Sequence, residues 1–65
     1  MAVYFWYAER DEKSETEPHL NQASGLVHGD VDEAYRRARR EAREDLDYLG
    51  VTKGFTIKQF NKVGE

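Results

Sequence analysis

The sequence predicts an α+β domain with the element order β-β-α-β, in which one long helix packs on one face of a three-stranded antiparallel sheet. Three observations lead to this prediction. An apolar periodicity of 3.6 residues runs through the middle of the chain, an aromatic segment lies near its start, and two more segments of strand composition flank the helix. With 65 residues the chain is expected to form a single domain, residues 1–65, near the lower size limit for independent folding.

The first strand is expected from about residue 2 to residue 10. Residues 3–7 are all β-branched or aromatic, and such residues favour an extended backbone. Strict alternation places Val3, Phe5 and Tyr7 on one face of the strand, and Tyr4 and Trp6 on the other. Because both faces are apolar, this strand is expected either at the centre of the sheet or with its second face covered by another part of the protein.

A polar and acidic segment follows, and it contains the only proline of the chain. Residues 11–19 are therefore expected to form an exposed acidic loop. The next strand has a weaker signal, because Leu26 and Val27 are its main strand formers and Gly25 dilutes it. We expect residues 20–28 to form an edge strand with a bulge near Gly25.

The helix has the clearest signal in the chain. Its apolar residues recur every three or four positions and share one stripe: Val31, Ala34, Tyr35, Ala38, Ala42, Leu46 and Leu49. Asp30 is expected to cap the first turn, and Glu33 to complete a capping box. Gly50 is expected to end the helix in a left-handed conformation, with Val51 against Leu46. The helix would then contain about 18 residues.

The last strand is expected over residues 55–63. Strict alternation places Phe55 and Ile57 on one face of this strand, and Thr56, Lys58, Phe60 and Lys62 on the other. If this strand docks beside the first, every neighbouring pair is antiparallel and the strand order is 2-1-3. One helix covers only one face of such a sheet. The second face is expected to be open and to carry residues from the set Tyr4, Trp6, Lys58, Phe60 and Lys62.

No pattern in the sequence predicts catalysis, a metal site or a cofactor. The chain has no cysteine, and His19 and His28 lack the spacing of a metal-binding pair on a helix. Glu44 and Asp45 are adjacent on the helix and so do not face each other. Phosphate-binding loops and nucleophile motifs are missing. We therefore expect a non-enzymatic protein located in the cytoplasm and not in a membrane, because no signal sequence or membrane-spanning apolar run is present.

Three groups of side chains are candidates for contact with a partner. The first consists of helix arginines suited to phosphates or carboxylates: Arg36, Arg37, Arg39, Arg40 and Arg43. Most of them lie in the first half of the helix, where the helix dipole disfavours positive charge. Helix stability alone therefore does not explain their positions. The second group consists of the loop acids Asp11, Glu12 and Glu15, and the third of the sheet residues Tyr4, Trp6 and Lys58. The structural alternatives are a solvated helix face, a solubilising loop and a second core layer.

Several short motifs resemble those of small bacteriophage inhibitors of host machinery. They are F-W in the first strand (Phe5, Trp6), D-E-A-x-x-x-A in the helix (Asp32, Glu33, Ala34, Ala38) and G-F-x-I before the last strand (Gly54, Phe55, Ile57). The pattern is similar to a phage inhibitor of bacterial RNA polymerase and to several anti-CRISPR proteins. This helix is longer and richer in arginine than that of the polymerase inhibitor. The resemblance implies a stoichiometric inhibitor that occludes a host protein or ribonucleoprotein complex.

The leading hypothesis is therefore a phage-encoded inhibitor of a CRISPR effector or of RNA polymerase. The alternative is a small nucleic-acid-binding regulatory domain that uses the helix arginines on phosphates. The net charge of −3 and the interleaved helix acids make nucleic acid the less favoured partner. A third interpretation is an assembly module that forms a homodimer through the open sheet face or an edge strand.

Overall fold

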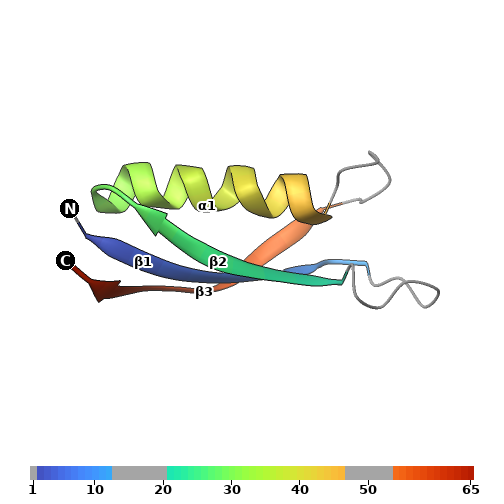
Figure 1. The fold of residues 1–65 in the computed structure, drawn as a ribbon. Coiled ribbons are helices and arrows are strands. Elements are labelled where there is room, and N and C mark those ends of the chain that lie inside the picture. Colours follow the sequence, from blue (N-terminus) through green and yellow to red (C-terminus); the bar gives the residue numbers. More distant parts are fainter. Residues whose placement is uncertain (1, 13–20, 47–53) are drawn as a thin grey trace.

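The computed structural model describes residues 2–12, 21–46 and 54–65 (Figure 1). Strand β1 (Val3–Arg10) is followed by β2 (Gln22–His28), helix α1 (Val31–Leu46) and β3 (Phe55–Gly64). The strands form one antiparallel sheet in the order β2-β1-β3, and α1 lies along one of its faces (Figure 1). The predicted α+β class, the β-β-α-β order and the central position of the aromatic strand are confirmed.

Helix α1 begins where the sequence predicts. The Asp30 Oδ1 atom accepts a 2.9 Å hydrogen bond from the Glu33 amide, and the Asp30 carbonyl accepts one of 2.8 Å from the Ala34 amide. Gly29 precedes this cap with φ 134°, a conformation that favours glycine. The Glu33 carboxylate lies 3.4 Å from Arg37 Nη2. In the described part of the chain no hydrogen bond returns from it to the Asp30 amide, so only half of the predicted capping box is present.

Removing the cap gives a first test. Asp30→Ala is expected to lower the free energy of unfolding by about 1 kcal/mol, because the first turn loses its side-chain acceptor. Urea denaturation followed by circular dichroism measures the change. Asp32→Ala is the matched control, since it removes an equal charge from the same turn but no hydrogen bond to the Glu33 amide. Equal losses in the two variants would mean that the charge, and not the cap, stabilises this end.

The buried stripe of α1 is built from small residues. Ala34, Ala38, Ala42 and Leu46 are fully buried, and the alanines let the helix backbone approach the sheet closely. Val31 and Tyr35 of the predicted stripe are exposed at its margin, at 55% and 39%. The predicted helix end at residues 49–51 lies outside the described residues.

Trp6 fills the space between α1 and the sheet and is only 1% exposed. It pairs with Gly25 of β2, where an added Cβ atom would lie 3.0 Å from Trp6 Nε1. The β1–β2 register runs without a shift from the pair Val3–His28 to the pair Glu9–Gln22. The expected bulge near Gly25 is therefore wrong, and the glycine instead makes room for the indole ring.

The irregularities of the sheet lie in the β1–β3 ladder. Lys58 is an extra residue between the partners of Tyr7 and Ala8, and a second register shift follows near the end of β3. The extra residue reverses the alternation of side chains along β3. Phe60 consequently pairs with Trp6 and packs with Ile57 against the core. The predicted separation of Ile57 and Phe60 onto opposite faces is wrong for this reason.

The helix covers the sheet face that carries Tyr4, Trp6 and Phe60. The Tyr4 and Phe60 rings stack with centroids 4.9 Å apart, and Tyr35 of α1 meets Phe60 edge-on at 5.2 Å. The expectation that these sheet aromatics lie on the open face is therefore wrong. No described element covers the opposite face, as predicted, but β1 presents Val3, Phe5, Tyr7 and Glu9 there.

Candidate interaction surfaces

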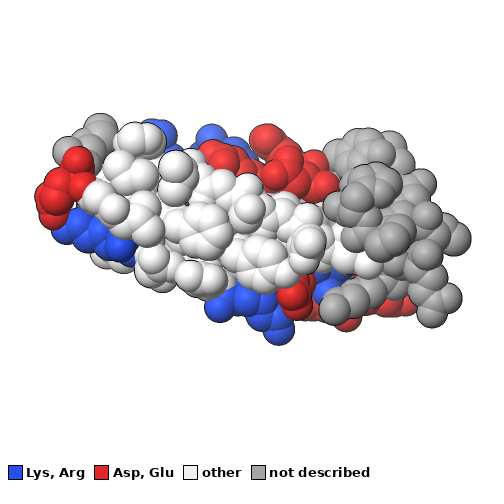
Figure 2. Space-filling view, turned by 60° about the horizontal axis from the view of Figure 1, so that its bottom comes forward, with Lys and Arg blue, Asp and Glu red and all other residues white. Residues whose placement is uncertain are grey.

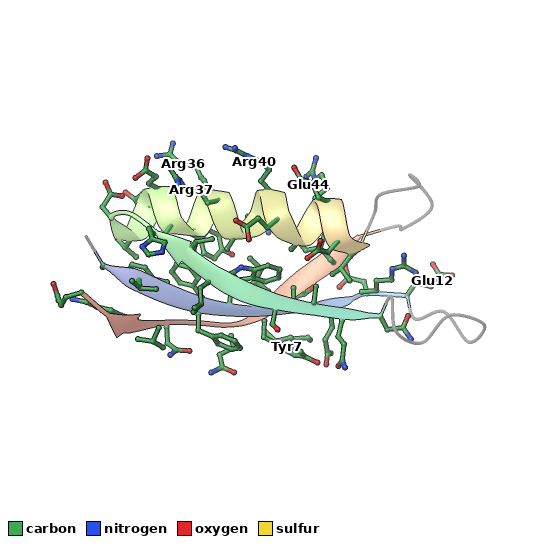
Figure 3. The ribbon with its side chains drawn as sticks, viewed as in Figure 1. Tyr7, Glu12, Arg36, Arg37, Arg40 and Glu44 are labelled. Carbon is green, nitrogen blue, oxygen red and sulfur yellow. The ribbon has the colours of Figure 1, made fainter. Side chains whose placement is uncertain are left out.

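Helix α1 turns an arginine row, defined as Arg36, Arg40 and Arg43, away from the sheet. At 3.6 residues per turn, these three positions fall within about 60° of the helix circumference. All three are exposed, and Figure 3 shows Arg36 and Arg40 pointing outward. Among the described residues no ion pair involves Arg36 or Arg40. The row is thus a set of outward-pointing cations on a helix whose opposite side packs against the sheet.

The other two candidate arginines make contacts within the protein. Arg37 pairs with Glu33, as their spacing of four residues predicts. The Arg39 guanidinium carbon lies 5.1 Å from the centre of the Phe55 ring, a cation–π contact that links α1 to the start of β3. The structure therefore divides the predicted arginine set between an outward row and two side chains at the flanks.

Acids interrupt the arginines on the same face. A shallow depression between the helix side chains has a lining of both signs: Glu33, Arg36, Arg37, Arg40, Glu41 and Glu44. Figure 3 shows Glu44 projecting from the same side of the helix as Arg40. This alternation fits a partner surface of mixed charge better than the uniform negative charge of a phosphate backbone.

Asp11, in the described part of the acidic loop, is exposed and also has a structural role. Asp11 Oδ1 accepts a 2.5 Å hydrogen bond from the Thr56 hydroxyl, and the Asp11 amide donates one of 3.1 Å to the Gly54 carbonyl. These bonds join the end of β1 to the start of β3. Asp11 and Glu12 are exposed, whereas Glu15 lies outside the described residues. Lys58 is exposed in the β3 bulge.

The open sheet face is almost free of charge. Its four cross-strand rows are His28–Val3–Gly64, Leu26–Phe5–Asn61, Ser24–Tyr7–Gln59 and Gln22–Glu9–Thr56. Glu9 is the single acid among these positions, and none is Lys or Arg, although 35% of the whole chain is charged. Figure 2 shows this uncharged surface with charged side chains along its margins. The open face is therefore distinct in chemistry from the helix face.

Tyr7 is the polar centre of the open face. Its hydroxyl donates to Glu9 Oε2 at 2.7 Å and lies 2.8 Å from Gln22 Oε1. The hydrogen bond to the Glu9 carboxylate, followed by lost hydration and the carboxylate's charge, raises the pKa of Tyr7 above its ordinary value. The bond favours the protonated phenol, because a phenolate would face a carboxylate.

The raised pKa predicts a pH dependence of stability. A group whose pKa is higher in the folded state contributes stability below its unfolded pKa, about 10 for tyrosine, and loses it as pH rises through the folded pKa. Alkaline titration of tyrosinate absorbance, with Tyr7→Phe as the reference, should place Tyr7 above the unfolded value. Glu9→Gln should lower this pKa, while Glu41→Gln on the helix should leave it unchanged. If the pKa of Tyr7 is the same in the unchanged chain, in Glu9→Gln and in Glu41→Gln, then Glu9 is not the cause of the raised pKa.

Sequence reasoning missed Arg10. This side chain is only 8% exposed, and its Nε donates a 2.9 Å hydrogen bond to the Leu46 carbonyl in the last turn of α1. A cation is favourable there, because the carbonyl end of a helix carries partial negative charge. The sequence did contain a signal for this contact. Side chains alternate along a strand, so Arg10 falls on the same side of β1 as the core residues Trp6 and Ala8.

Within residues 2–12, 21–46 and 54–65, no group of three or more metal-binding side chains gathers, and no helix is long and apolar enough to cross a membrane. No protein-family model matches the chain, and comparison with curated proteins and with solved structures found no match. The candidate surfaces therefore rest on the geometry described above.

Proposed function

We propose that the chain is a non-enzymatic binding protein that inhibits a nucleic-acid-handling complex by occupying part of its working surface. The arginine row supplies the main contact. The observation that carries this proposal is the exposure of Arg36 and Arg40 without an ion pair among the described residues. Their helix is fixed by its buried alanine stripe, so these guanidinium groups can bind carboxylates at little cost in backbone order.

The charge pattern favours a protein surface as the partner. Glu41 and Glu44 lie among the arginines, and the whole chain has a net charge of −3. A bare duplex carries about one negative charge per 1.7 Å and would be repelled by these acids. The resemblance to small phage inhibitors supports a bacterial RNA polymerase or CRISPR effector as the target. A phage-encoded inhibitor of this kind acts in the cytoplasm of the infected cell.

The alternative function is nucleic-acid binding through the same arginine row, with guanidinium groups on phosphates. The specific observation in its favour is that helix spacing places the three exposed arginines on one side of α1, where Figure 3 shows Arg36 and Arg40 projecting together. This function predicts direct binding to DNA or RNA at low salt and a steep loss of affinity as salt rises.

A charge-reversal experiment tests the proposed contact. The tagged protein is used to capture partners from a nuclease-treated bacterial lysate, beside an untreated sample, and the affinity of the captured complex is then measured. Arg36→Glu with Arg40→Glu is expected to weaken binding about thirtyfold or more, since buried arginine contacts contribute about 2 kcal/mol or more. Circular dichroism should show that the variant remains folded.

Lys58→Glu with Lys62→Glu is the matched control, because it changes the net charge equally at β3. Binding that survives the arginine reversal but fails in the lysine variant would move the contact to the sheet edge. Capture of polymerase or effector subunits after nuclease treatment supports a protein target. Capture that disappears with nuclease would favour the nucleic-acid alternative.

A further inference from the structure

The outer edge of strand β2 carries backbone amides and carbonyls that point away from β1. The Arg10 amide donates to the Asn21 carbonyl, and the Gly29 amide donates to the Ala2 carbonyl. In an antiparallel pair these bonds fix which residues face the partner strand, so the odd-numbered residues of β2 bond to β1. The amides and carbonyls of the even-numbered residues point to the free edge: Gln22, Ser24, Leu26 and His28. No hydrogen bond among the described residues uses them.

Among the described residues, the outer edge of β3 carries features that disfavour pairing with another chain, and the outer edge of β2 carries none. Two register shifts break the outer edge of β3, and Lys58 and Lys62 add positive charge to it. Bulges and lysines are common devices against pairing with another chain. The β2 edge has an unbroken register, no proline and no charged residue over Gln22–His28. It is therefore a template for an added strand.

We propose that two copies of this chain pair through antiparallel β2 edges and form a dimer with one continuous six-stranded sheet. A two-fold axis beside Gly25 gives the longest overlap of the outward residues. Ser24 then faces Leu26 of the partner copy, and Gln22 faces its His28. No like charges meet in this register, because β2 contains no acid, lysine or arginine. The strand is thus complementary to itself.

A second copy fits this edge for two further reasons. A domain of 65 residues has a small core, and self-association is a common way for such chains to gain stability. The axis runs perpendicular to the sheet, so both α1 helices lie on one face of the joined sheet. The dimer is independent of the proposed inhibitory contact. Pairing through one strand buries less than the roughly 800 Å² per partner of a standard interface, so a dissociation constant in the micromolar range is expected.

Sedimentation velocity of the full chain across the micromolar range tests the dimer. A concentration-dependent shift from monomer to dimer is expected. Ser24→Pro removes only an outward amide and no bond to β1, and it should weaken the dimer about tenfold or more while circular dichroism stays unchanged. Lys62→Pro is the matched control, because Lys62 lies at an outward position of β3, and it should leave the dimer intact. Thr56→Pro would not serve as a control, since the Thr56 amide faces β1.

Cross-linking tests the register, and the chain has no native cysteine to interfere. An oxidised mixture of Ser24→Cys and Leu26→Cys chains should give a mixed disulfide, because facing Cα atoms in such a pair lie about 5.5 Å apart. A mixture of Ser24→Cys and His28→Cys chains should give at least tenfold less. A monomer at every concentration, or equal cross-linking in both mixtures, would overturn the proposal. Binding of an extended peptide by a purely monomeric chain would show that the edge serves another partner instead.

Discussion

Replacing Trp6 by alanine is expected to unfold the domain or leave it barely stable. Truncating a buried tryptophan costs about 3–5 kcal/mol, because apolar contacts are lost and a cavity remains. A chain of 65 residues has a total stability of roughly 3–10 kcal/mol at about 0.05–0.15 kcal/mol per residue. Trp6 is 1% exposed and lies between the alanine stripe of α1 and Gly25. Urea denaturation followed by far-ultraviolet circular dichroism measures the loss.

Phe5→Ala is the matched control for this prediction. Phe5 is the neighbour of Trp6 in β1, but it lies on the uncovered face and is only half-buried. Its truncation is expected to cost less than half as much as Trp6→Ala, since burial of less apolar area is lost. A loss for Phe5→Ala as large as that for Trp6→Ala would mean that the helix covers the other face of the sheet.

Arg10→Ala is expected to lower the free energy of unfolding by about 2–3 kcal/mol. The hydrogen bond from the Arg10 guanidinium to the Leu46 carbonyl is charge-assisted, and such bonds contribute about 1.5–3 kcal/mol. The aliphatic part of the side chain is buried as well and loses its packing. Hydrogen exchange should show that the last turn of α1 loses protection before the rest of the helix.

Two variants separate the bond from the charge. Arg43→Ala removes a cation from the same turn of α1 on its exposed side, and a change within about 0.5 kcal/mol is expected. Arg10→Lys keeps the charge but replaces the planar donor group, so an intermediate loss is expected. If Arg10→Ala and Arg43→Ala are equally harmful, the bond to Leu46 does not stabilise the fold.

Sequence reasoning predicted the elements whose signals are local. The helix was recognisable from its apolar period, and its cap from Asp30 and the residues that follow. The central strand was recognisable because residues 3–7 are apolar on both faces. The strand order then followed from the requirement that a central strand have a neighbour on each side. Apart from the strand order, these inferences depend on residues close together in the chain.

The choice of the covered sheet face could not be read from alternation. Both faces of β1 carry aromatic residues, so the pattern does not decide between them. The decision depends on the fit of Trp6 against Gly25 of another strand and against the alanines of α1. The bulge at Lys58 has no glycine to mark it in the sequence, and it becomes visible only in the pairing of β3 with β1.

The candidate site shows the same division. The arginine row and the pair Glu33–Arg37 follow from helix geometry alone. The contact of Arg39 with Phe55 and the bond of Asp11 to Thr56 join residues far apart in the chain. They depend on how the elements pack, and for that reason sequence spacing did not reveal them.

Trp6 also equips the protein with an intrinsic optical probe. It is the only tryptophan in the chain, and its indole is enclosed by the core with no hydrogen-bond partner for Nε1 among the described residues. Its fluorescence therefore comes from one environment that is dry in the folded state and wet in the unfolded state. Unfolding of the unlabelled chain, and of every variant that keeps Trp6, is readable as a red shift of a single emitter.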